Sequence, residues 1–197
     1  GVKYYTNKPV NKINVSDSVA SSIEVDKKNI YYDIILSGAD YHHTEKLLPL
    51  KFRQYSDKYW ESRVFAPSSL LFYVGFNKKL KNVLHHNLFF DTDFDKHAKE
   101  IYDDPQWPSD PLFYANFTSK TNSKTAPAGC ENAFFLIPIA TNLKDTPKIR
   151  DKYFNKLMKK LKAFTGQNLD EAIIYKKSFC VSDFKREYNS YGGNAYG

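Results

Sequence analysis

The sequence predicts a mixed α/β, or α+β, fold in which a mixed β-sheet is flanked by helices. Two observations favour this class. Short runs rich in Val, Ile, Tyr and Phe, bounded by polar turn residues, recur along the chain and are typical of strands. From Pro147 to Thr165, in contrast, the apolar side chains repeat with the helical period. Strands and helices therefore share the chain.

The sequence patterns of residues 1–62 predict strands followed by helices. Four short strand patterns fill the first forty residues, and the last of them leads into the small-residue turn Ser37-Gly38-Ala39-Asp40. In such a turn the backbone can closely approach a ligand. Helical patterns follow at 43–48 and 51–62. The four expected strands are Val2–Thr6, Pro9–Val15, Ala20–Val25 and Ile30–Leu36.

The segment from Pro67 to Phe90 is rich in apolar and aromatic residues. Its two oily runs, Leu70–Phe76 and Leu84–Phe90, predict strands on either side of the cationic turn Lys78-Lys79-Leu80-Lys81. Strands this apolar on both faces must be covered by a core or by an apolar ligand. The lysines would stay in water or against anionic headgroups. The segment is thus compatible both with a plain core and with a surface for an oily molecule.

The second half of the chain alternates strands with two helices. The short helix Asp93–Tyr102 carries one apolar face. The long helix Pro147–Thr165 has Thr146 as its expected N-cap, Pro147 in its first turn and Gly166 at its end. The apolar face of the short helix consists of Phe94, His97, Ala98 and Ile101, and the expected strands are Pro111–Thr118, Asn132–Ala140 and Ala172–Val181.

Composition and net charge limit the kinds of molecule that the protein is expected to bind. Aromatic residues make up 16% of the chain, with 15 Tyr and 15 Phe, and large flat side chains suit a wide apolar cavity as well as a core. The net charge is +7, and most of the excess is Lys, whereas Arg is favoured for bidentate phosphate and base contacts. We therefore predict no nucleic-acid partner and a basic surface that is either solvated or faces an anionic membrane.

The sequence lacks the motifs that mark several kinds of functional site. The two cysteines lack CxxC spacing, which argues against a disulfide scaffold and favours a cytoplasmic protein. The pairs His42-His43 and His85-His86 lack the i, i+4 spacing of zinc-binding helices, so we predict no metal site. No run of 18 apolar residues occurs, and no Gly-rich phosphate motif or nucleophile elbow is present. No catalytic residue is assigned.

Five segments, taken in order, resemble the carotenoid desaturase family, that is, flavin-dependent phytoene desaturases (phytoene dehydrogenases) of the bacterial, flavobacterial-like type. They are DIILSGADYHH at 33–43, PSSLLFYVGFNKKL at 67–80, LHHNLFF at 84–90, DPLFYANFTSKTNSKTAPAGCENAFFLIPIATNL at 110–143 and DFKREYNSYGGNAYG at 183–197.

The resemblance implies a division of the chain. Residues 1–40 would be a β segment of the flavoprotein FAD-binding domain, residues 41–183 the substrate-binding domain, and residues 184–197 the start of the return into the FAD domain. The family's N-terminal Gly-rich motif and its C-terminal Gly/Pro-rich segment have no counterpart here. The chain is therefore expected to be an internal fragment, inactive by itself.

The resemblance also implies a cofactor and its contacts. The cofactor would be FAD, accepting a hydride equivalent from a saturated carbon pair. The pattern Pro9-Val10-Asn11-Lys12-Ile13 matches one whose Val contacts the adenosine through its backbone in related flavoproteins. Val10 is therefore the expected FAD contact, followed by Ser37, Gly38 and Ala39 near the ADP portion.

The implied substrate is phytoene or a related C40 polyene, held by apolar area alone. Alternatives are another isoprenoid (γ-carotene, a hydroxylated carotenoid or retinol) or a basic lipid-binding module without redox chemistry. The expected location is the cytoplasm, peripheral at the inner membrane, with the turn Lys78–Lys81 as a candidate contact. Each of the aromatic candidates for the substrate pocket could equally be core: Trp60, Phe72, Tyr73, Phe89, Phe113, Phe134 and Phe135.

Overall fold

The computed structural model describes residues 1–196, which form two compact units. The first unit comprises residues 1–64 and 188–191, and the second comprises residues 65–187 and 192–196. The roles expected for residues 1–40, 41–183 and 184–197 stay predictions.

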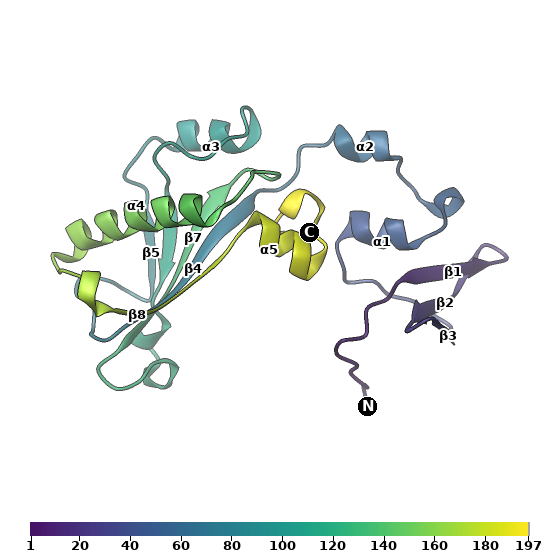
Figure 1. Ribbon diagram of the computed structural model, residues 1–197, viewed down its shortest axis with the longest axis horizontal. Coiled ribbons are helices and arrows are strands. Elements are labelled where there is room, and N and C mark those ends of the chain that lie inside the picture. The colour runs from purple at the N-terminus through teal and green to yellow at the C-terminus, as the bar shows by residue number, and fades with distance from the viewer. Residues whose placement is uncertain (197) are drawn as a thin grey trace. The chain divides into compact units, whose positions relative to one another are not determined.

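The first unit contains a three-stranded antiparallel sheet in the order β1-β2-β3 (Figure 1). Its strands are joined by the two-residue turns Asp17-Ser18 and Asp26-Lys27. All four of these residues have positive φ, as type I′ hairpin turns require. The strands are β1 (Lys12–Ser16), β2 (Val19–Val25) and β3 (Lys28–Tyr31).

Short helices complete the first unit: α1 (Tyr41–Leu47), η1 (Leu50–Phe52) and α2 (Asp57–Glu61). The buried Glu45 accepts hydrogen bonds from Trp60 Nε1 at 3.1 Å and from the backbone N–H of Gln54 at 2.7 Å. This carboxylate therefore joins α1 to α2.

The second unit is built on a five-stranded antiparallel sheet in the order β5-β6-β7-β4-β8 (Figure 1). The two longest strands, β4 and β7, lie next to each other. Phe72 is opposite Phe135, and Tyr73 is opposite Phe134. The strands are β4 (Ser68–Phe76), β5 (His86–Phe89), β6 (Phe113–Asn116), β7 (Glu131–Ile139) and β8 (Ile173–Phe179).

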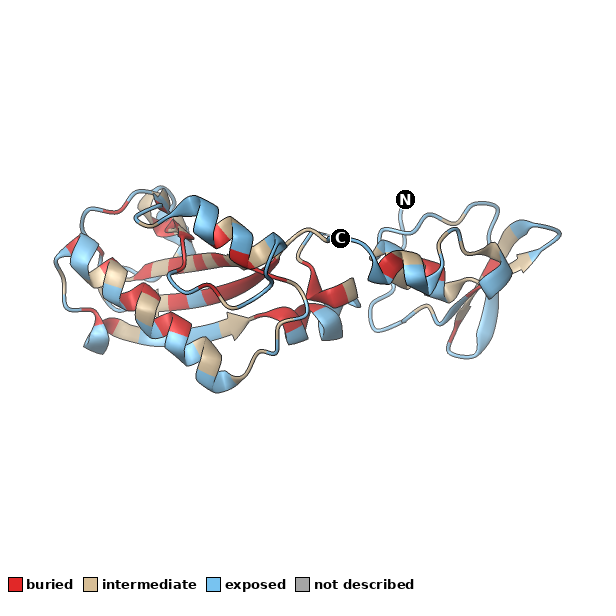
Figure 2. Ribbon diagram, turned by 90° about the horizontal axis from the view of Figure 1, so that it is seen from above, coloured by how far each residue is buried: buried red, intermediate tan, exposed pale blue. Residues whose placement is uncertain are grey.

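One face of this sheet packs against α4 (Pro147–Thr165) and forms the core. The rings of Phe72 and Phe154 are 5.1 Å apart across this interface. Figure 2 shows the buried residues along the central strands and on the helix stripe that faces them. The remaining elements are α3 (Phe94–Tyr102), α5 (Val181–Tyr188), η2 (Thr118–Lys120), η3 (Ser123–Thr125), η4 (Asp170–Ala172) and η5 (Tyr191–Gly193).

The strand and helix predictions are confirmed through most of the second unit. Helix α4 has the predicted bounds, is capped by Thr146 through the N–H of Ile149, and ends at Gly166 with φ of 66°. The predicted helix Asp93–Tyr102 is α3. Helix α5 was not predicted.

Three predictions in the first unit are wrong. The strand expected at Ile30–Leu36 is β3 at Lys28–Tyr31, and residues 32–36 lie in no strand. Residues Val2–Thr6 form no strand, because no described strand pairs with them and their large side chains are exposed. The single helix expected at 51–62 is two short elements, since Ser56 caps a new helix by accepting from the N–H of Tyr59.

Candidate functional site

The face of the five-stranded sheet opposite α4, called here the outer face, carries apolar and aromatic side chains in rows. Residues directly opposite each other in paired strands share a face. Leu88, Tyr114, Leu136 and Leu71 therefore form one row across β5, β6, β7 and β4. The next row is His86, Asn116, Phe134 and Tyr73.

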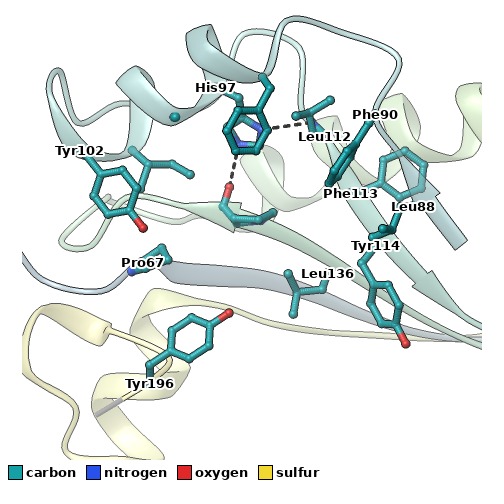
Figure 3. Close-up of a pocket in the computed structure, with 14 residues that line it drawn as sticks. Pro67, Leu88, Phe90, His97, Tyr102, Leu112, Phe113, Tyr114, Leu136 and Tyr196 are labelled. Carbon is teal, nitrogen blue, oxygen red and sulfur yellow. Dashed lines mark hydrogen bonds between the residues drawn. The ribbon is translucent and has the colours of Figure 1, made fainter. Parts of the chain in front are cut away.

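An apolar cavity of about 300 Å³ lies between α3 and one end of the outer face. Pro67 and Pro138 line the cavity and have no backbone N–H, and nearly all of the remaining lining surface is apolar. Figure 3 shows Tyr102 and Tyr196 on one side of the cavity and Leu88 and Phe90 on the other. The predicted apolar face of α3 lines it: Phe94, His97, Ala98 and Ile101.

His97 is a polar group in the α3 side of this cavity (Figure 3). Its hydrogen bonds indicate which ring nitrogen carries the proton. Its Nε2 lies 2.9 Å from the carbonyl oxygen of Pro138, and its Nδ1 accepts from the N–H of Leu112 at 3.2 Å. A ring that donates at Nε2 and accepts at Nδ1 is neutral. Both ring nitrogens therefore attach α3 to its neighbours, to Leu112 just before β6 and to Pro138 of β7.

A second hollow of about 390 Å³ continues along the outer face, away from the cavity. Tyr73, Phe134 and Tyr175 supply its aromatic side, whereas Asn116 and Asn132 supply amide groups. The outer face thus runs from an apolar end beneath α3 to an end where aromatic rings and amides mix.

Because side chains alternate along a strand, the predicted substrate residues of the sheet lie on two different faces. Tyr73 and Phe134 lie on the outer face, with ring centroids 5.4 Å apart. Trp60 lies in the first unit, where it bonds to Glu45. The other four are buried in the core, although Phe113 also borders the cavity: Phe72, Phe89, Phe113 and Phe135. The sequence-based selection missed Leu88, Tyr114, Leu136 and Pro138, which period-2 alternation could have located once the face was known.

Of the predicted cofactor residues, Val10 borders a pocket of the first unit. A pocket of about 490 Å³ in the first unit is lined by Val10 together with lysines, tyrosines and an amide. Lys8 is paired with Asp26 of the same lining, which leaves Lys28 to pair with a phosphate and the tyrosine rings to stack on a base. Its other residues are Tyr5, Lys8, Ile23, Val25, Asp26, Lys28, Asn29, Ile30 and Tyr32.

Ser37, Gly38 and Ala39 are exposed and lie outside the lining of that pocket. The Ser37 hydroxyl lies 2.7 Å from that of Thr44 and also accepts from the N–H of Ala39 at 3.3 Å. These contacts order the turn before α1, which Asp40 caps by accepting from the N–H of His43 at 3.0 Å. The turn and Val10 therefore do not line the same pocket.

His42 lies in an aromatic cluster of the first unit. Its ring centroid is 4.1 Å from that of Tyr191 and 5.3 Å from that of Trp60. Burial, helped by the nearby charge of Lys46, lowers the pKa of His42. The surroundings of His42 thus favour the neutral imidazole.

The basic turn 78–81 is bound to the rest of the second unit. Leu80 is buried, Lys78 donates to the carbonyl of Asn168, and Lys79 Nζ is 3.4 Å from Glu131 Oε1. Glu131 also pairs with Lys120 at 2.9 Å. Burial by itself would raise the pKa of Glu131, but the hydrogen bonds from Ser119 and Lys120 outweigh it and lower the pKa.

Residues 1–196 contain neither a cluster of metal-binding side chains nor a membrane-spanning helix. No group of three or more His, Cys, Asp or Glu side chains in this range is arranged to hold a metal ion. Within the same range, none of the helices has both the length and the apolar character needed to span a bilayer.

Comparison with known proteins points to one family. The carotenoid 3,4-desaturase of Haloarcula japonica is 39% identical over all of this chain and 40% of its own length. The 1-hydroxycarotenoid 3,4-desaturase of a Flavobacterium species is 26% identical over all of this chain and 40% of its own length. For the zeta-carotene-forming phytoene desaturase of Myxococcus xanthus the identity is 25%, over all of this chain and 38% of that protein.

A solved structure has a similar fold. An oxidoreductase from Methanosarcina mazei superposes with a TM-score of 0.59 at 12% identity, covering 88% of this chain and 37% of that protein. No protein-family model matches the chain. The chain spans about 40% of the length of the curated relatives.

The resemblance stated from the five sequence segments is therefore confirmed by relatives that align with every part of the chain. The protein has a mixed α/β fold, and over its whole length it is related to the carotenoid desaturase family.

Proposed function

We propose that this chain supplies the substrate-binding domain, and a β segment of the FAD-binding domain, of an FAD-dependent carotenoid desaturase. The observation that carries the proposal is the outer face of the five-stranded sheet, with an apolar cavity at one end. A carotenoid precursor is nearly pure hydrocarbon and offers no polar handle. Its binding must come from apolar surface, at roughly 25 cal/mol for each Å² removed from water.

The dimensions of the outer face suit a long substrate better than a compact one. Pockets for drug-sized ligands have volumes of roughly 300–1,000 Å³, so the cavity of about 300 Å³ would hold one end of a C40 chain. The remainder would lie along β7 and β4. From Pro138 to Asn132 the strand rises roughly 20 Å, at about 3.3 Å per residue.

The first unit would hold part of the cofactor. Val10 would contact the adenosine through its backbone, with Lys28 near the phosphates. Ser37, Gly38 and Ala39 remain the second proposed contact, near the ADP portion. When bound, FAD would accept the hydride equivalent removed from the carbon pair. The residues of the outer face would orient the polyene and exclude water from it.

The names of the relatives suggest the reaction. They include 3,4-desaturases and phytoene desaturases, so we propose dehydrogenation of phytoene or a related C40 polyene. γ-Carotene, a hydroxylated carotenoid or retinol are the alternative substrates within this class.

A membrane is the proposed source of the substrate. Leu88, Phe90 and Phe94 line the cavity and are 65%, 60% and 61% exposed, respectively. Exposed apolar side chains at a pocket mouth mark a surface that contacts lipid or protein. These three side chains are called here the rim. We propose that the rim makes peripheral contact with the cytoplasmic side of the inner membrane.

The test is desaturation by the complete desaturase that contains this chain, purified with FAD and supplied with phytoene in liposomes. We expect the absorbance maximum to move to longer wavelength as conjugation grows, with flavin reduced under anaerobic conditions. Unchanged substrate together with oxidised flavin would contradict the proposal for phytoene, and the same assay with the alternative isoprenoids would then decide the substrate.

A second candidate, a basic lipid-binding module without redox chemistry, is favoured by the exposed rim and the net charge of +7. It predicts retention on anionic vesicles without any change of carotenoid absorbance, even with FAD present.

A further inference from the structure

Three polar side chains, His86, Tyr114 and Asn116, lie together on the outer face, between its two hollows. The Tyr114 ring borders the apolar cavity, whereas Asn116 borders the second hollow. In Figure 3 the Tyr114 ring stands beside Leu136, and its hydroxyl points away from His97. His86 is directly opposite Asn116 in the sheet, so the three side chains share a face. A polyene that runs along the outer face would therefore pass this cluster.

The hydrogen bonds within the cluster indicate where its protons lie. Asn116 Nδ2 donates to the Tyr114 hydroxyl oxygen at 3.0 Å and also lies 3.2 Å from His86 Nδ1. An amide nitrogen only donates, so the imidazole nitrogen that it meets carries no proton. The Tyr114 hydroxyl lies 2.5 Å from the same nitrogen and donates to it. The cluster is therefore a tyrosine whose O–H is directed at the lone pair of a neutral imidazole.

Dehydrogenation of a carbon pair releases a hydride and a proton, and the proton needs a base beside the polyene. Tyrosine and lysine side chains hold their own protons at neutral pH, whereas a neutral histidine can accept one. His97 uses both ring nitrogens in hydrogen bonds to the backbone, and His85 bonds to Thr121. His86, in contrast, is joined to the cavity through the Tyr114 hydroxyl.

We propose that Tyr114 and His86 together take the proton that the polyene loses. As the C–H bond breaks, its electron pair forms the new C=C bond with the carbon whose hydride goes to FAD, and the proton binds the Tyr114 oxygen. The original hydroxyl proton moves to His86 Nδ1, and the resulting imidazolium later releases a proton to water. Asn116 orients the hydroxyl by donating to its oxygen. The inference rests on the proposed function, because it assigns a proton acceptor for that reaction.

The experiment measures kcat of the complete desaturase, loaded with FAD and supplied with phytoene in liposomes. Tyr114→Phe should lower kcat by about a hundredfold or more, as the loss of a general base does. His86→Asn should do the same, because its amide oxygen can accept a hydrogen bond but no proton. Tyr31→Phe is the matched control, since this exposed tyrosine lies on β3 outside the outer face, and its kcat should equal that of the unmodified protein.

Substrate binding provides a second readout that does not depend on turnover. With the flavin reduced beforehand, the Kd for radiolabelled phytoene should change by less than about threefold in Tyr114→Phe, because the apolar ring stays in place. A loss of kcat at nearly constant Kd indicates a role in the reaction rather than in holding the polyene.

The pH profile distinguishes a proton acceptor from a purely structural group. In the unmodified protein kcat should fall at acid pH, because a protonated imidazole cannot take the proton, and His86→Asn should lack this acid limb. The titratable side chains in contact with His86 are Tyr114 and His85, whose ring centroid is 4.3 Å away. Because both remain in His86→Asn, an acid limb that persists in this variant would belong to another group and would overturn the inference.

A kcat that falls by less than about threefold in either Tyr114→Phe or His86→Asn would overturn the inference. It would leave the proposed function in place, because the unmodified protein would still desaturate phytoene. Failure of the unmodified protein to desaturate any of the proposed isoprenoids would remove the proposed function and the inference with it.

Discussion

The side chain of Glu131 joins three segments of the second unit through its buried carboxylate. It accepts from the Ser119 hydroxyl, from the N–H of Leu80 at 3.3 Å and from Lys120 at 2.9 Å. A carboxylate with this many donors remains ionised although its side chain is fully buried. The cationic turn 78–81 is consequently part of the folded core through Leu80 and Glu131, which the run of lysines in the sequence does not reveal.

Replacing Glu131 by Gln should lower the free energy of unfolding at pH 7 by about 3–5 kcal/mol, because Lys120 loses its buried partner. The pKa of Glu131 is lower in the folded protein than in the unfolded chain. Its contribution is therefore fully present above the unfolded pKa of about 4.3 and is lost as pH falls through the folded pKa.

Urea unfolding between pH 3 and pH 7 measures this dependence. The difference in stability between the unmodified protein and Glu131→Gln should shrink as the pH falls below about 4. A difference that stays constant over this range would show that the carboxylate does not carry the effect. The exposed Asp151→Asn is a control for the loss of a surface ion pair, and should change stability by about 1 kcal/mol or less.

Among the elements, β4 shows how one strand can serve two purposes. Its side chains alternate between the α4 side and the outer face, so that neighbours in the sequence have different surroundings. Phe72 is 1% exposed and packs on Phe154, whereas Tyr73 is 41% exposed and lies beside Phe134. The first position therefore belongs to the core, whereas the second is exposed on the outer face, where we propose substrate contact.

Alanine at these two neighbouring positions should have opposite consequences. Phe72→Ala should lower the free energy of unfolding by about 3–5 kcal/mol, since it leaves a cavity in the core. Tyr73→Ala should leave stability within about 1 kcal/mol but raise the KM for the carotenoid, because it removes exposed apolar surface. Denaturant unfolding and steady-state kinetics of the complete desaturase would measure both. A normal KM in Tyr73→Ala would contradict the proposed role of the outer face.

For the molecule as a whole, the exposed apolar rim and the basic net charge bear on the proposed contact with a membrane. The rings of Phe90 and Phe94 are 6.2 Å apart beside the cavity and are both exposed. Lys78 and Lys79, in contrast, already bond within the chain. We therefore expect the rim, rather than the turn 78–81, to provide most of the lipid contact.

Replacing both Phe90 and Phe94 by Ser should weaken binding to anionic liposomes by at least about tenfold, since two aromatic side chains would no longer enter the lipid. Co-sedimentation with the liposomes would measure this loss. Ile174→Ser is the matched control, because this side chain is similarly exposed, at 61%, but lies on β8 away from the cavity. Equal losses for the two proteins would argue against a specific rim.

The sequence by itself determined the family, the mixed α/β class and the long helix, because these depend on local signals. Thr146 and Gly166 delimit α4 through contacts within a few residues of each end. The first helices were less well predicted, since the cap at Ser56 divides a pattern that appeared continuous in the sequence. Aromatic content also marked the strands from which the candidate site is built.

Only the tertiary structure decided which aromatic side chains lie on the outer face and which form the core. That distinction depends on the side of the sheet that α4 covers, which is a long-range contact between segments about eighty residues apart. The same is true of the His86, Tyr114 and Asn116 cluster, which strand pairing brings together from two strands. Alternation along a strand separates two faces, but only packing between distant elements makes one of them a core and leaves the other for a ligand.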